Sequence, residues 1–316
     1  MNHAGALVAV PRDAPADPAD RIEYSPGDQA QCDLWFPPVR IPLGSGQCGS
    51  PPVLVIACSF SRFLMARMLP SRVTSDLLGG LWSLLNEELG AVPRRLVWDN
   101  EAGIGQRGRL ADGVAAFTGS LAIRIVQLPP RDPESKGIVE RANRFLETSF
   151  LPGRAFSDPD DFNAQLRAWL PKANQRLVRA TGARPIDRLE LDMAGMLPLP
   201  PITPEVRWHA RVRLGRDYYV RVLGNDYSVD PVAIGRMIDV HADLEAVTVF
   251  AGQRLVAAHR RAWSRREVFT DPAHVQSASK LRAAFQASAP TAVDSDLGRD
   301  LHEYDHAFGL TTAVNP

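Results

Sequence analysis

Short apolar runs separated by turn residues dominate the first half of the chain. The segment AQCDLWF (30–36) alternates apolar and polar positions as a strand does, and VLVIAC (53–58) is the continuous apolar run of a strand covered on both faces. RFLMARML (62–69) predicts a third strand, and the Pro- and Gly-rich stretch 37–52 connects the first two. We therefore expect a sheet that begins with three consecutive strands.

A helical period follows these strands. Apolar residues recur at helical spacing from Val73 to Leu89, and Gly90 ends the predicted helix. The sequence then predicts a strand, a helix, a strand and a further helix, at 94–99, near 109–119, at 122–128 and from about Glu134. This order favours an α/β fold, a ribonuclease H-like mixed sheet with flanking helices.

The second half of the chain changes character twice. Residues 153–204 predict a helical extension that ends in the Pro-rich linker LPLPPITP. Residues 205–264 hold five short strands punctuated by Gly and Asn turns, which predict a small all-β barrel. With a disordered leader at 1–20, the α/β core at 21–152 and a helical tail at 265–316, we expect five segments.

Charge and cysteine content narrow the function classes. Lys+Arg and Asp+Glu both number 36, so the chain lacks the basic surplus typical of proteins that neutralise DNA phosphates. Basic residues nevertheless gather at 131–154, 207–221 and 260–266, and each stretch fits an ordinary solvated face equally well. The three cysteines form no C-x-x-C pair, which favours neither a disulfide framework nor a thiolate zinc site.

Membrane and secretion signals are missing from the sequence pattern. No apolar run approaches the roughly 20 residues of a membrane helix, and the first 20 residues do not match a secretory signal. We therefore expect a cytoplasmic protein.

Three acidic residues fall on elements that a ribonuclease H-like sheet would bring together. Asp33 lies in the first predicted strand, Asp99 at the end of the fourth and Glu140 in the helix after the fifth. The first and fourth strands are neighbours in such a sheet, so the two aspartates would converge. Mg²⁺ prefers oxygen ligands, and two such ions about 3.5–4 Å apart catalyse phosphoryl transfer. Glu140 by itself, flanked by cations, also fits a solvated helix face.

The blocks around these acids resemble a known family. The resemblance is to the IstA-type DDE transposases of bacterial insertion sequences, in the integrase catalytic core superfamily, and it is carried by YSPGDQAQCDLW, LVWDNEAGIG and DPESKGIVERANRFLE. GNDYSVDP and VAAHRR resemble the carboxy-terminal β-barrel of that family. The resemblance covers about residues 21–262.

Chemistry and partners follow from the resemblance. It implies an enzyme in which Asp33, Asp99 and Glu140 are the catalytic residues and ligate two Mg²⁺ or Mn²⁺ ions, to cleave DNA 3′ ends and join them to target DNA. The partners implied are element ends, target DNA, further copies of the chain on that DNA and an ATPase helper. The residues expected to contact DNA are Lys136, Arg141, Arg144, Arg211, Arg213 and Arg221.

One part of the family pattern is missing. Transposases of this family usually carry helix-turn-helix domains ahead of the first acid, whereas only 32 residues precede Asp33 here. We therefore expect a shortened chain in which recognition of the element ends is in doubt. A catalytically silent DNA-binding remnant is the alternative.

A glycine motif suggests different chemistry. GIGQRG (103–108) matches the G-x-G-x-x-G dinucleotide fingerprint, and Asp132 follows the next strand. Four residues separate the apolar strand from Gly103, whereas a dinucleotide turn begins directly at the strand end. The glycine motif is therefore weaker evidence for a dinucleotide site than the acidic blocks are for a metal site.

Two further motifs suggest other chemistry. HEYDHAFG (302–309) matches the H-E-x-x-H zinc peptidase motif, with His302 and His306 as ligands and Glu303 as base, but no third ligand follows. A zinc peptidase is thus a remote alternative. Cys32 has no histidine in its block, so we expect a core position rather than a thiol nucleophile.

Overall fold

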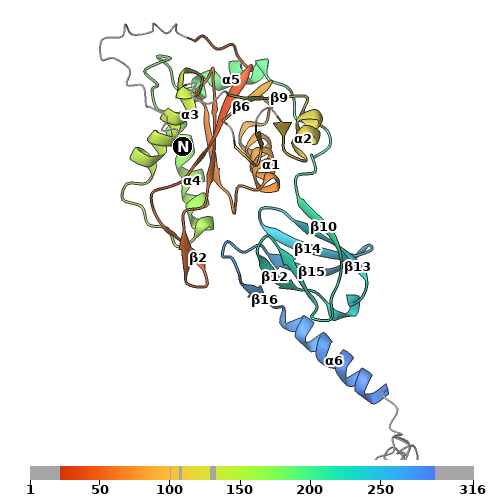
Figure 1. Cartoon of the computed structure of the whole chain (residues 1–316). Helices are drawn as coiled ribbons and strands as arrows, with labels where there is room; N and C mark the ends of the chain where they lie inside the picture. The colour runs from red at the N-terminus through yellow and green to blue at the C-terminus, as the bar shows by residue number, and fades with distance from the viewer. Residues whose placement is uncertain (1–21, 100, 107–108, 129–132, 289–316) are drawn as a thin grey trace, which may run out of the picture.

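A computed structural model describes residues 22–99, 101–106, 109–128 and 133–288 (Figure 1). The predicted leader, Asp132 and the H-E-x-x-H motif lie outside these ranges, as does the side chain of Lys136. No helix within them is long and apolar enough to cross a membrane.

A five-stranded mixed sheet forms the centre of the larger domain. Its strands are β1 (Gln29–Trp35), β4 (Val53–Cys58), β5 (Leu64–Met68), β6 (Arg95–Trp98) and β9 (Arg124–Gln127). The order is β5-β4-β1-β6-β9, in which β5, β4 and β1 are antiparallel neighbours and β1, β6 and β9 run parallel. The mixed α/β sheet is confirmed, and the first and fourth predicted strands are indeed neighbours.

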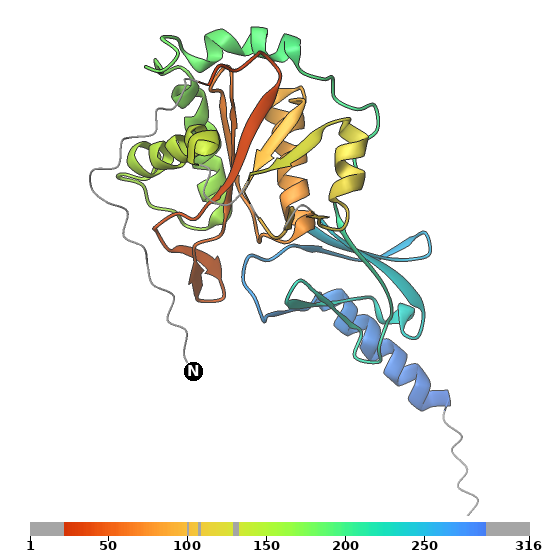
Figure 2. The same ribbon diagram turned by 45° about the horizontal axis from the view of Figure 1, so that its top comes forward.

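Helices cover both faces of this sheet (Figures 1 and 2). One face carries α1 (Thr74–Ser83), its π-helical continuation Leu84–Leu89 and α2 (Val114–Leu121), and the other carries α3 (Pro133–Phe145), its continuation Leu146–Phe150 and α4 (Pro159–Asn174). All six residues of β4 are buried because alternate side chains enter the two cores. Gly90 ends the α1 segment in the left-handed conformation at φ 71°.

Two asparagines of α4 cover the open edge of β5. Asn163 bonds both backbone groups of Met68, with donor to acceptor distances of 2.8 and 3.1 Å. Asn174 bonds both backbone groups of Leu64 at 2.8 and 2.9 Å. The amides therefore take the place of a further strand, which satisfies the edge and fixes the end of α4 beside the β4–β5 turn.

Short elements complete the larger domain. They are the hairpins β2 (Ile41–Gly44) with β3 (Gln47–Gly49) and β7 (Gly105–Gln106) with β8 (Arg109–Leu110), and the helix α5 (Pro185–Gly195). Asp192 of α5 is buried and accepts hydrogen bonds from the backbone N–H groups of Gly27 and Ser61. These contacts fix α5 to the segment before β1 and to the turn after β4.

The C-terminal strands do not pair into a closed barrel. One sheet holds β10 (Trp208–Arg213), β13 (Met237–Ala242), β14 (Ala246–Ala251) and β15 (Arg254–Arg260), and another holds β11 (Tyr219–Val222), β12 (Asn225–Ser228) and β16 (Val268–Phe269). No strand pairing joins the two sheets within 205–271. The predicted barrel is therefore not confirmed. A 3₁₀ turn (Pro231–Ala233) separates β12 from β13, and α6 (Pro272–Ser288) follows β16.

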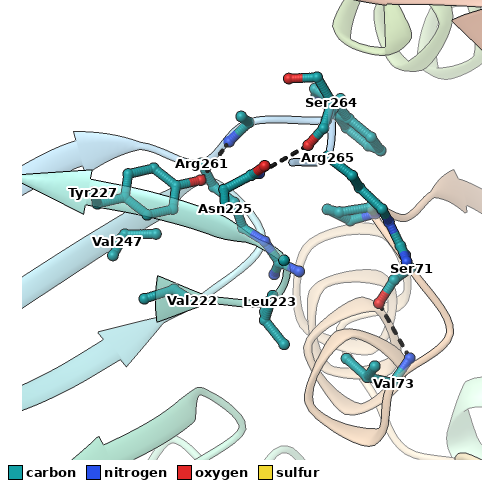
Figure 3. Close-up of a pocket in the computed structure, with 14 residues that line it drawn as sticks. Ser71, Val73, Val222, Leu223, Asn225, Tyr227, Val247, Arg261, Ser264 and Arg265 are labelled. Carbon is teal, nitrogen blue, oxygen red and sulfur yellow. Dashed lines mark hydrogen bonds between the residues drawn. The ribbon is translucent and has the colours of Figure 1, made fainter. Parts of the chain in front are cut away.

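A buried ion pair joins the two domains. Arg261, just after β15, donates to both carboxylate oxygens of Asp76 on α1 at 2.6 and 2.8 Å, and both side chains are at most 5% exposed. Ser71 also donates to Asp76. Beside this pair, Ser71 and Val73 of the core face Leu223 and Asn225 of the C-terminal domain across a pocket of about 250 Å³ (Figure 3).

Candidate active site

The two predicted aspartates lie on or directly after neighbouring parallel strands. In the pairing of β1 with β6, Gln31 lies opposite Val97, where the pairing ends. Asp33 lies two residues further along β1, and Asp99 directly follows β6. Residues two apart on a strand share a face, so Asp33 is on the face of Gln31.

Helix α3 packs over that face. The side-chain oxygen of Gln31 accepts hydrogen bonds from the backbone N–H groups of Ile138 and Val139, each at 3.1 Å, and Gln31 is fully buried. Further along, Asn143 donates from Nδ2 to Oδ2 of Asp33 at 2.8 Å. Two polar contacts thus align α3 with β1.

Glu140 lies between these contacts along α3. It is exposed, as is Asp99, whereas Asp33 is half-buried. Glu140 precedes Asn143 by three residues, so both side chains leave the same flank of the helix. Among the described residues, however, no three or more His, Cys, Asp or Glu side chains gather closely enough to hold a metal ion. The meeting of all three acids in one site stays a prediction.

The sequence pattern did not single out Gln31 or Asn143. Oδ1 of Asn143 is buried and has no hydrogen-bond partner in the described part of the chain. Carboxylate oxygens are the ligands that hard divalent cations prefer, so the residue types of Asp33, Asp99 and Glu140 would suit Mg²⁺ or Mn²⁺. A buried Gln within a strand was the only signal that the sequence offered.

The predicted DNA contacts lie on α3 of the larger domain and on β10 and β11 of the C-terminal domain. On α3, Arg141 and Arg144 are exposed. In the C-terminal domain, Arg211 and Arg213 share one face of β10, and both are exposed. Arg211 and Arg221 are about two-thirds exposed, and their nearest carboxylate contacts, to Asp239 and Asp226, are long at 3.7 and 3.6 Å.

The competing motifs gain no support from the fold. Gly105 and Gln106 form a hairpin with β8, and α2 begins only at Val114, so the glycine segment does not lead into a helix as a dinucleotide loop does. Burial raises the pKa of the Cys32 thiol well above its usual value, with smaller contributions from Cys58 and Asp33. Cys32 is therefore a core residue, as predicted.

Comparisons with known proteins find transposases that are similar to parts of this chain. Residues 199–271 match the family model of the Mu transposase C-terminal domain. The chain is 30% identical to the transposase for insertion sequence element IS21 of Pseudomonas aeruginosa, over 42% of this chain and 34% of that protein. It is 28% identical to a putative transposase for insertion sequence IS1162 of Pseudomonas fluorescens, over 82% of this chain and 48% of that protein.

A solved structure aligns with about half of this chain. It is the catalytic core domain of BIV integrase. The alignment covers 52% of this chain and 94% of that chain, at 17% identity and a TM-score of 0.39. The chain spans about a third and about half of the two curated transposases described above. The resemblance inferred from the acidic blocks is confirmed: this chain is a relative of the IS21-type transposases.

Proposed function

We propose that the chain is a DDE transposase core that joins DNA 3′ ends to target DNA in the presence of Mg²⁺ or Mn²⁺. The observation that carries the proposal is the β1–β6 register, which supports a shared site for Asp33 and Asp99 beneath α3. The strand order β5-β4-β1-β6-β9 supports a ribonuclease H-like core. The relatives, which are named transposases, support the reaction class.

Each residue of the proposed site has a distinct task. Asp33, Asp99 and Glu140 supply carboxylates for two divalent ions, which when bound activate the attacking oxygen and stabilise the leaving one. Asn143 holds the carboxylate of Asp33 in one orientation through its hydrogen bond. Gln31 accepts hydrogen bonds from the backbone of Ile138 and Val139 and so fixes the part of α3 that carries Glu140.

The joining step is an in-line displacement. The oxygen of a DNA 3′-hydroxyl attacks a phosphorus atom of the target and loses its proton, while the bond from that phosphorus to the neighbouring 3′ oxygen breaks. One phosphodiester replaces another, and no covalent enzyme intermediate forms. The protein contributes position and electrostatic stabilisation.

DNA contacts extend beyond the acids in this proposal. Lys136, Arg141 and Arg144 of α3 would contact one stretch of DNA, and Arg211, Arg213 and Arg221 of the C-terminal domain another. Oligomerisation on paired ends and an ATPase helper belong to the same proposal, on the basis of the family resemblance.

Asp99→Asn tests the proposal. The change keeps the size of the side chain but removes the charge that attracts divalent cations, so joining of a pre-cut DNA end should fall about a hundredfold or more. The measurement is the yield of joined product with Mg²⁺ or Mn²⁺. Asp187→Asn is the matched control, because Asp187 is an exposed aspartate of α5 and should leave the yield unchanged.

Two outcomes would count against the proposal. Joining by the Asp99→Asn protein at a rate near that of the parent removes Asp99 from the site. A parent that binds DNA but joins none under any metal condition supports the silent DNA-binding remnant instead.

A further inference from the structure

A pocket lined by four arginines lies beside α3, on the flank away from Asp33. Its volume is about 590 Å³, and it is bounded by the β4–β5 turn, α3 and the loop that follows α4. Small apolar residues, among them Ile138 and Ala142, form its floor. The arginines are Arg62, Arg141, Arg176 and Arg179.

No carboxylate in the described part of the chain forms an ion pair with these positive charges. Burial lowers the pKa of Arg62, and the like charges of Arg141 and Arg188 lower it further, although Tyr24 opposes them. The pocket therefore concentrates positive charge at a partly desolvated place, where an anion is strongly favoured.

Arg62 occupies a backbone position that seldom carries a long side chain. It lies in the turn between β4 and β5 with φ 65°, a conformation that favours Gly or Asn. Its guanidinium stacks over the ring of Tyr24 at 5.0 Å, and Nη1 is buried without an acceptor in the described residues. A strained residue with an unused donor suggests a functional contact.

Arg176 is held in place before any ligand arrives. Its guanidinium lies 4.1 Å from the ring centre of Phe145, and Nη1 donates to the carbonyl oxygen of Ala173 at 2.8 Å. Asn174 fixes the start of the same loop against Leu64. Binding would thus require little ordering of this side of the pocket.

We propose that this pocket binds a backbone phosphate of DNA. Guanidinium groups match phosphate oxygens with paired N–H donors, and the four arginines offer such donors from three sides. Arg141 directly follows Glu140, so α3 contributes both to the pocket and to the proposed acids. The inference that the pocket binds an anion depends only on the four arginines. The inference that this anion is a DNA phosphate depends on the proposed function.

A charge-matched pair of variants tests the pocket. Arg62→Asn with Arg179→Ala removes two of its charges, and Asn suits the backbone at position 62. The control, Arg167→Ala with Arg236→Ala, removes two exposed arginines elsewhere. DNA affinity, measured by fluorescence anisotropy across a salt series, should fall at least tenfold in the pocket variant, with a salt slope shallower by about one. The control should match the parent.

Arginine labelling of the parent protein provides a second readout that does not depend on folding of a variant. DNA should protect Arg141 and Arg179 from phenylglyoxal, as read by mass spectrometry, and leave Arg167 reactive. If the parent binds DNA but its arginines are labelled equally with and without DNA, the inference is wrong. It is also wrong if the pocket variant and the control variant bind DNA with equal affinity. Protection by poly-glutamate but not by DNA would assign the pocket to an acidic protein segment. A parent without DNA affinity contradicts the proposed function itself.

Discussion

Asn143 connects α3 to the first acid of the proposed site. Its Nδ2 donates to Asp33, and its Oδ1 has no partner among the described residues. Residues that orient a metal ligand contribute to metal affinity without being ligands themselves. Asn143 is therefore a positioning residue in this proposal, and its effect should appear in the metal dependence of the reaction.

Removal of this amide tests that role. In Asn143→Ala, the Mg²⁺ concentration needed for half-maximal joining should rise about tenfold or more, because the carboxylate of Asp33 loses its fixed orientation. The measurement is joining yield against Mg²⁺ concentration, with Thr148→Ala as the control near the end of the same helical segment. A parallel loss of yield at every Mg²⁺ concentration would indicate a purely structural role for Asn143.

Among single residues, the sequence could indicate the three acids but not Gln31 and Asn143, which position them in this proposal. Asp33, Asp99 and Glu140 stand in blocks that resemble a family, so their residue types and spacing carry information. Gln31 and Asn143 carry amides, which occur on any polar helix face or strand. Their contacts join residues more than 100 positions apart, and only the packing of α3 on β1 makes them visible.

Among the elements, β4 and the α1 segment were the easiest to predict. A continuous apolar run and a leucine period ended by Gly90 have few other interpretations. Pairing was harder, because alternation predicts that a strand exists but not which edges meet. The predicted barrel is not confirmed for this reason: β12 pairs with β11 and with the two-residue strand β16, and hydrophobic periodicity does not predict such pairings.

Strand β10 allows a test of the C-terminal basic face. Arg211 and Arg213 project from one side of this edge strand, so we expect them to contact about one or two phosphates. Replacing both with Ala should therefore weaken DNA binding and reduce the slope of log affinity against log salt by about one or two. The measurement is the slope of log affinity against log salt. The control is Arg254→Ala with Arg282→Ala, which removes the same charge from β15, at the opposite edge of the sheet, and from α6. An unchanged slope in the β10 variant would remove this face from DNA binding.

Across the whole molecule, one buried ion pair relates the two domains. Asp76 and Arg261 are 185 residues apart, and no sequence pattern links them, so their contact could not be predicted. Because both charges are buried, each depends on the other for compensation. The pair therefore fixes the basic face of the C-terminal domain relative to the core that carries the three acids.

The central claim is that Asp33, Asp99 and Glu140 hold two divalent ions. Anomalous diffraction from crystals of the whole chain grown with Mn²⁺ tests it most directly, since it locates the metal without requiring activity. We predict two Mn²⁺ peaks about 3.5–4 Å apart between the three carboxylates, and the loss of at least one in Asp99→Asn. Saturating Mn²⁺ with no peak at these carboxylates, or two peaks unchanged in Asp99→Asn, would contradict the claim.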